Sequence, residues 1–242
     1  MLVHGGLSDS RVWRRQLEDL ADEFTVIAWD APGCGQSPDA PEWWRLPDYA
    51  DCLAGFIRGL GLPRVHLLGH SFGGALVLEV YRRHPTVPVS LILASAYAGW
   101  AGSLPADEVT RRLQFAERAA RMQSDGAFEP GSVPGIFGDV MLAETIRWLS
   151  EIMADSRPAA TRAMARALAE ADLNNMLSSV SVPTLLLHGE ADDRATPSVA
   201  RALAARISTS RLVVLPRLGH ESYLESPDLF NAQVRSFLHT IA

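Results

Sequence analysis

The stretch that most constrains this chain of 242 residues is Val-His-Leu-Leu-Gly-His-Ser-Phe-Gly-Gly, residues 65–74. Its first four residues are largely apolar and begin with a β-branched side chain, which is typical of a short buried strand. After Gly74 the apolar residues recur at helical spacing, so Ser71 is predicted to lie on an abrupt turn from strand to helix. Such a turn requires small neighbours at Gly69 and Gly73, because side chains there would collide with the adjoining strand and helix.

Strand and helix patterns alternate along most of the chain. Strand-like apolar runs are found at residues 1–3, 24–29, 65–68, 90–95, 184–187 and 211–215. Helical patterns are found at residues 13–20, 49–60, 74–84, 199–207 and 227–238. This alternation predicts an α/β fold with a mainly parallel sheet covered by helices on both faces.

The pattern changes near Tyr97. Residues 98–180 are rich in Ala and Arg, show helical patterns and contain no convincing strand. We therefore predict a core made of residues 1–97 and 181–242, with residues 98–180 inserted as a helical unit over one end of the sheet. The chain is long enough for one domain that carries such an insertion.

The composition is that of a globular protein, with 48% hydrophobic and 21% charged residues. A net charge of −6 and the lack of a basic stripe argue against a nucleic-acid partner. No apolar run is long enough to span a bilayer, and the start of the chain lacks a signal-peptide layout, so we expect no membrane partner and a cytoplasmic location. The two cysteines, Cys34 and Cys52, form no CxxC pair and are expected to be free thiols.

Polar side chains suited to catalysis follow several of the predicted strands. Loops at the carboxyl ends of parallel strands meet at one edge of the sheet, where ligands bind. Three such loops carry Ser71, the pair Asp192 and Asp193, and His220. A serine hydroxyl becomes a good nucleophile when a base takes its proton, and the base needs a third group to fix its tautomer. The residues therefore predict nucleophilic catalysis, with either aspartate as the third group.

The motif and the order of these residues resemble those of the α/β-hydrolase superfamily. Residues 69–73 match G-x-S-x-G, the nucleophile elbow of that fold, and a serine, an acid and a histidine follow one another in its chain order. The resemblance covers essentially the whole chain. It implies an α/β-hydrolase fold with a helical cap, and Asp192 rather than Asp193 as the acid. Relatives carry a hairpin before the loop at His4, so we expect a misplaced start or a truncation here, with strand 24–29 left at the sheet edge.

The resemblance also implies a reaction. Ser71 would attack a carbonyl, His220 would accept the proton, and the N–H groups of Gly6 and Phe72 would form the oxyanion hole. No metal or organic cofactor is implied. The expected enzyme is a carboxylesterase-like serine hydrolase that cleaves small to medium, mainly uncharged esters or lactones through an acyl-enzyme. Alternatives are carbon–carbon bond hydrolysis, perhydrolysis or acyl transfer on the same triad, or a slow-turnover ligand-binding or signalling protein.

The substrate pocket is expected to be mainly apolar. Its predicted wall consists of Leu7, Trp100, Phe137 and Met141. The arginines of the insertion fall at a helical spacing that suits a solvated face better than a carboxylate clamp; they are Arg111, Arg112, Arg118 and Arg121. His4 is expected to brace its own loop. The expected partners are the small-molecule substrate and, as an alternative to a monomer, a second copy of the chain.

Overall fold

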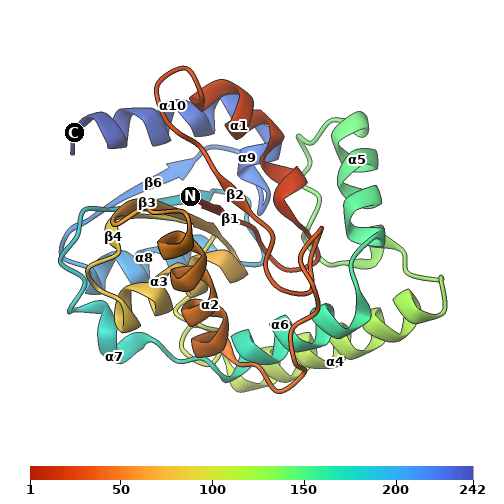
Figure 1. Ribbon diagram of the computed structural model, residues 1–242. Coiled ribbons are helices and arrows are strands. Elements are labelled where there is room, and N and C mark those ends of the chain that lie inside the picture. The colour runs from red at the N-terminus through yellow and green to blue at the C-terminus, as the bar shows by residue number, and fades with distance from the viewer. Residues whose placement is uncertain (242) are drawn as a thin grey trace.

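A computed structural model describes residues 1–241 and shows one six-stranded sheet flanked by helices (Figure 1). The strand order is β2-β1-β3-β4-β5-β6, and every paired neighbour in the sheet is parallel. The strands are β1 (Leu2–Val3), β2 (Ala28–Trp29), β3 (Val65–His70), β4 (Pro88–Ala94), β5 (Thr184–Gly189) and β6 (Ser210–Leu215). The predicted mainly parallel sheet is therefore confirmed.

Strand β2 lies at the edge of the sheet, as predicted, but it is much shorter than predicted. The sequence predicted a strand over residues 24–29, whereas the strand covers only Ala28 and Trp29, with one further hydrogen bond from Leu2 N–H to the Ile27 carbonyl at 2.7 Å. Its partner β1 is equally short, Leu2–Val3, and the register pairs two residues of each strand. An apolar run becomes a strand only where an adjacent strand accepts its hydrogen bonds.

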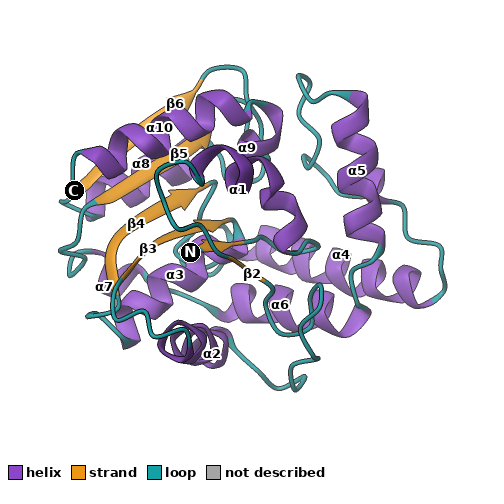
Figure 2. Cartoon of the chain, turned by 45° about the horizontal axis from the view of Figure 1, so that its top comes forward, coloured by secondary structure: helices purple, strands orange, loops and turns teal. Residues whose placement is uncertain are grey.

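The central strands β3, β4 and β5 bury both of their faces, whereas most residues of β6, at the edge of the sheet, are half-buried or exposed. Successive residues of β4 alternate between two apolar clusters. Leu91 and Leu93 of β4 belong to one cluster and Ile92 belongs to the other. The first cluster is covered by a layer of three helices, α2 (Leu46–Gly59), α3 (Phe72–Arg83) and α8 (Pro197–Arg206), and the second by a layer of two, α1 (Arg14–Leu20) and α10 (Pro227–His239). The two layers lie on opposite sides of the sheet, with α1 and α10 on one side and α2 and α3 on the other (Figure 1 and Figure 2), which confirms the predicted coverage of both faces.

Two further short helices flank the layers. A 3-10 helix, η1 (Ser10–Trp13), leads into α1, and α9 (Ser222–Glu225) precedes α10. None of the helices within residues 1–241 is long and apolar enough to cross a bilayer.

The segment between β4 and β5 forms helices without a strand in the described chain. These are α4 (Ala106–Ser124), η2 (Pro130–Ser132), α5 (Ala143–Ala154), α6 (Pro158–Glu170) and α7 (Asn174–Leu177). The two ends of this segment lie side by side and are joined by two backbone hydrogen bonds. Trp100 N–H donates to the Leu168 carbonyl at 2.8 Å, and Leu173 N–H donates to the Ala98 carbonyl at 2.9 Å. Helices α4, α5 and α6 lie beyond the carboxyl ends of the strands (Figure 1).

Candidate active site

Ser71 occupies the sharp turn between β3 and α3. Its φ of 51° and ψ of −110° are unfavourable for a residue with a side chain, so the surrounding structure must hold this conformation. The turn also brings α3 very close to the sheet. A Cβ on Gly69 would lie 2.1 Å from the Gly73 carbonyl oxygen, and a Cβ on Gly73 would lie 2.2 Å from that of Val3. The predicted need for small residues beside Ser71 is confirmed.

Asp192 and His220 follow the neighbouring strands β5 and β6 and meet at the edge of the sheet. Both side chains are buried, 1% and 2% exposed. His220 Nδ1 lies 3.0 Å from each carboxylate oxygen of Asp192. Because a carboxylate can only accept, Nδ1 carries the proton and the neutral ring keeps a lone pair on Nε2. Asp193 is exposed and makes no such bond, so the structure brings Asp192, and not Asp193, to His220.

The surroundings fix the charge of both groups. Burial alone would raise the pKa of the Asp192 carboxyl, but His220 and the backbone N–H of Ala195, 2.8 Å away, hold it well below its usual range. For His220, burial lowers the pKa below that of an ordinary histidine, although Asp192 opposes the shift. An ionised acid beside a neutral imidazole is the state that a general base requires at neutral pH.

A cavity of about 550 Å³ lies between the carboxyl end of the sheet and helices α4 and α6. Ser71 and His220 both line it, whereas Asp192 lies behind His220 and does not. Gly6 and Phe72, the predicted oxyanion donors, line the cavity as well. As the first residue of α3, Phe72 has an N–H group without an intrahelical acceptor, which leaves it free for a ligand oxygen.

The predicted wall is only partly found around the cavity. Leu7 and Trp100 line it, but Phe137 and Met141 do not. These two side chains pack instead into the apolar cluster shared with α1, α5 and α10. The sequence placed them near turns of the insertion but could not tell which of two apolar surfaces they would join, and we correct the prediction for both.

The prediction that the arginines of α4 face solvent is wrong for Arg112. Its side chain is only 12% exposed and lines the cavity. The guanidinium donates to a Glu108 carboxylate oxygen at 2.6 Å, to the Tyr97 hydroxyl at 2.9 Å and to the Arg194 carbonyl at 3.0 Å. It also lies 5.4 Å from the centre of the Trp100 ring. Glu108 and Arg112 are four residues apart, a spacing at which opposite charges on a helix pair with each other. This spacing was the signal in the sequence that Arg112 has a partner on its own helix.

Sequence reasoning missed most of the wall that the insertion contributes. These residues come from α4, from the loop after η2 and from α6, and include Phe115, Ala119, Val133, Ile136, Met164 and Leu168. Helical periodicity could have identified the apolar face of each helix. It could not have shown that the faces of α4 and α6 meet above Ser71.

His4 braces the loop that carries Gly6, as expected. Its Nδ1 lies 2.7 Å from the Gly5 carbonyl oxygen, and its Nε2 lies 3.0 Å from the backbone nitrogen of Ala31. A carbonyl accepts and an N–H donates, so the ring is protonated on Nδ1 and both nitrogens are satisfied. The loop beside Ser71 is thereby fixed to the loop that follows β2.

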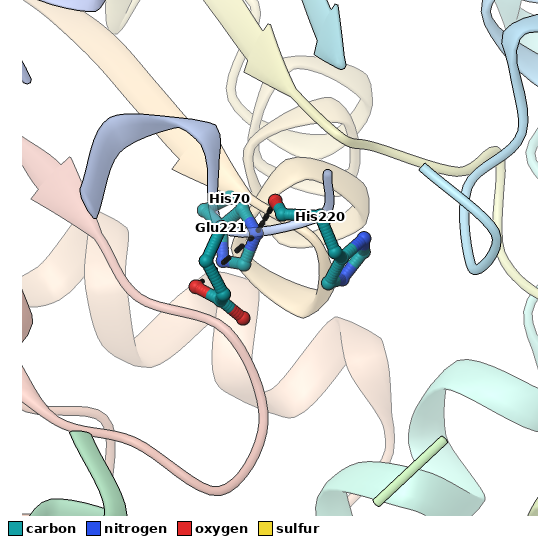
Figure 3. A group of neighbouring side chains, drawn as sticks. All are labelled: His70, His220 and Glu221. Carbon is teal, nitrogen blue, oxygen red and sulfur yellow. Dashed lines mark hydrogen bonds and ion pairs between the residues drawn. The ribbon is translucent and has the colours of Figure 1, made fainter. Parts of the chain in front are cut away.

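His70, His220 and Glu221 form a compact, buried polar cluster (Figure 3). Their potential ligand atoms lie within 4.8 Å of one another, which raises the question of a metal site. However, His70 Nε2 lies 3.0 Å from the backbone carbonyl oxygen of His220, which requires a proton on that nitrogen. A protonated Nε2 has no lone pair for a metal, so the nitrogen that faces Glu221 acts here as a hydrogen-bond donor to the backbone.

Comparisons with known proteins support the same fold. The model of the alpha/beta hydrolase family matches residues 1–233. The putative carbamate hydrolase RutD of Pantoea ananatis is 30% identical over 249 residues, which cover 96% of this chain and 85% of the relative. The pimeloyl-(acyl-carrier protein) methyl ester esterase of Neisseria meningitidis serogroup A is 28% identical and covers 99% of this chain and 76% of the relative. The solved structure of a thermophilic esterase from Thermogutta terrifontis, with malate bound, superposes with a TM-score of 0.86 at 28% identity, covering 99% of this chain and 89% of that one.

Proposed function

The chain belongs to the alpha/beta hydrolase family, and we propose that it is a serine hydrolase in which Ser71, His220 and Asp192 form the catalytic triad. The observation that carries the proposal is the buried pair of Asp192 and His220, with His220 Nδ1 3.0 Å from each carboxylate oxygen, beside a cavity that Ser71 also lines. The strained backbone of Ser71 supports it, because such strain is typical of a nucleophile presented at the end of a strand.

In the proposed reaction, Ser71 Oγ forms a bond to the substrate carbonyl carbon while its proton passes to His220 Nε2. Asp192 keeps Nδ1 protonated and stabilises the imidazolium that results. The carbonyl oxygen becomes negative and is held by the N–H groups of Phe72 and Gly6, each contributing about 3–4 kcal/mol. His220 returns its proton to the leaving alkoxide, which departs as an alcohol. Water then attacks the acyl carbonyl while His220 Nε2 takes its proton, the bond to Ser71 Oγ breaks, and His220 returns the proton to Oγ as the acid is released.

The substrates that we propose are small to medium carboxylic esters or lactones. A cavity of about 550 Å³ is of the size that small-molecule sites have, about 300–1,000 Å³. The guanidinium of Arg112 is already engaged by Glu108, Tyr97 and the Arg194 carbonyl, so it is not available to bind a substrate carboxylate. Arg111 and Arg118 also line the cavity, but both side chains are exposed to solvent and Arg111 is paired with Glu108, so we propose mainly uncharged substrates. We further propose that residues 98–180 act as a cap that encloses the substrate and excludes water.

A substrate panel tests this proposal. Neutral esters with acyl chains of two to twelve carbons, a set of lactones, and carbon–carbon bond substrates such as vinylogous diketones are compared by kcat/KM. We expect the short and medium esters or lactones to be preferred, with Ser71→Ala inactive on all of them. A clear preference for the diketones, or turnover of every ester below about 0.01 per second, would contradict an esterase and favour the alternatives.

A further inference from the structure

We propose that His70 is a positioning residue that holds His220 in register with Ser71; the proposal rests on the proposed function. The two candidate catalytic residues come from loops far apart in the chain, and each loop needs a fixed position relative to the other. His70 is the immediate neighbour of Ser71 in the turn, and its side chain reaches across to the backbone of His220. It therefore connects the nucleophile turn directly to the loop of the base, over a separation of 150 residues.

The hydrogen bond between His70 and His220 can have only one direction. His70 Nε2 lies 3.0 Å from the His220 carbonyl oxygen, which can only accept, so Nε2 is the donor. A carboxylate oxygen of Glu221 lies farther from Nε2, at 3.8 Å. Burial lowers the pKa of the His70 ring to about 4, so the ring is neutral near pH 7 and the Nε2–H tautomer persists.

The ring is held in place on its other sides as well. Its centre lies 4.9 Å from the ring of His220 and 4.9 Å from the ring of Tyr223, and the side chain is 2% exposed. The remaining nitrogen, Nδ1, has no hydrogen-bond partner and lies against Gly5, where a Cβ would come within 2.8 Å of it. A buried nitrogen without a partner has a cost, so packing alone would favour an apolar ring. The bond from Nε2 to His220 is the reason to have a histidine here.

The position of His220 matters because the proton must pass from Ser71 to its Nε2. A displacement of about 1 Å at a reacting group can reduce the rate by about 10²-fold. Asp192 fixes the orientation of the His220 ring through Nδ1, but it does not fix the backbone from which the ring projects. His70 supplies that second restraint, from the same turn that presents the nucleophile.

Two substitutions separate the hydrogen bond from the packing. His70→Phe keeps an aromatic ring of similar volume but removes the donor, and His70→Gln places an amide N–H where Nε2 was. The control is His66→Phe in the same strand, where the ring nitrogen Nδ1 is 2.8 Å from the Ser90 hydroxyl and outside the cavity. Each variant is assayed for kcat and KM on a short neutral ester, and for its melting temperature.

We expect His70→Phe to lower kcat by about 10- to 100-fold while KM changes by less than about threefold. His70→Gln is expected to recover most of this loss, and His66→Phe to stay within about twofold of the wild type. A folded His70→Phe variant with the wild-type kcat, or a His70→Gln variant as slow as His70→Phe, would overturn the proposal. Loss of activity in His66→Phe to the same degree would also overturn it, because it would point to general loosening.

A measurement on the wild-type protein covers the case in which the variants do not fold. Nitrogen-15 NMR of the histidine rings is expected to show His70 with its proton on Nε2 at neutral pH. A proton on Nδ1, or a charged ring, would overturn the proposal. If the wild type hydrolyses none of the esters, the proposed function fails, whereas wild-type hydrolysis with an unaffected His70→Phe variant contradicts only the role of His70.

Discussion

At the scale of single residues, the candidate site depends on how burial changes proton affinity. His220 is surrounded by protein, and this desolvation outweighs the attraction of the Asp192 carboxylate, so the pKa of the imidazole is lowered. The base must be neutral to accept a proton from Ser71. A lowered pKa therefore keeps the base competent in more acidic solution than an ordinary histidine would allow.

The pH dependence follows from this shift. We expect kcat/KM to rise with pH through an apparent pKa below about 6.5, the ordinary value for histidine, and then to level off. The measurement is the initial rate on a neutral ester, whose own ionisation does not interfere. A midpoint above about 7, or a rate that does not fall even at about pH 4, would contradict a buried His220 as the base.

The two neighbouring aspartates offer a matched pair of variants. Asp192→Asn keeps the shape of the side chain but favours the wrong tautomer of His220, so kcat is expected to fall by about 10³- to 10⁴-fold. Asp193→Asn is expected to stay within about threefold, because that side chain is exposed and makes no bond to His220. If Asp193→Asn proves the slower enzyme, the acid has been assigned wrongly.

At the scale of elements, the sequence predicted the strands and helices of the core well and the insertion less well. Strands β3 to β6 were placed within two residues at each end, because buried parallel strands read as apolar runs. Strand β2 was overpredicted, and the register pairs only two of its residues with the equally short β1. In the insertion, periodicity identified helices but not their partners, so Phe137, Met141 and Arg112 were assigned to the wrong surfaces.

Arg112 links a helix of the insertion to residues of the core. It joins α4 to Tyr97 and to the Arg194 carbonyl, in the loop that also carries Asp192. Arg112→Ala leaves these partly buried groups without a partner, so we expect the free energy of unfolding to fall by about 2–4 kcal/mol in urea denaturation. Arg111→Ala is the control, because that side chain is 68% exposed and should change stability by less than about 0.5 kcal/mol. Equal losses in the two variants would contradict a role for Arg112 in joining the cap to the core.

At the scale of the whole molecule, the order of the strands assembles the site. Because β1 lies beside β3 and β5 lies beside β6, the loop of Gly6 adjoins the turn of Ser71, and the loop of Asp192 adjoins that of His220. The sequence predicted that these loops share one edge of a parallel sheet. The strand order and the hydrogen bond from His70 to His220 could not be predicted from the sequence, because contacts between distant segments leave no periodic signal in it.

The central claim is that Ser71 is a nucleophile activated by His220, and a fluorophosphonate probe tests it most directly. The probe forms a phosphorus–oxygen bond with an activated serine and releases fluoride, and the adduct is located by intact mass and peptide mapping. We expect one adduct, on Ser71, no adduct in Ser71→Ala, and labelling slowed by about 10³-fold or more in His220→Ala. An adduct on a different residue, unchanged labelling of Ser71→Ala, or no reaction of the folded wild type would contradict the account.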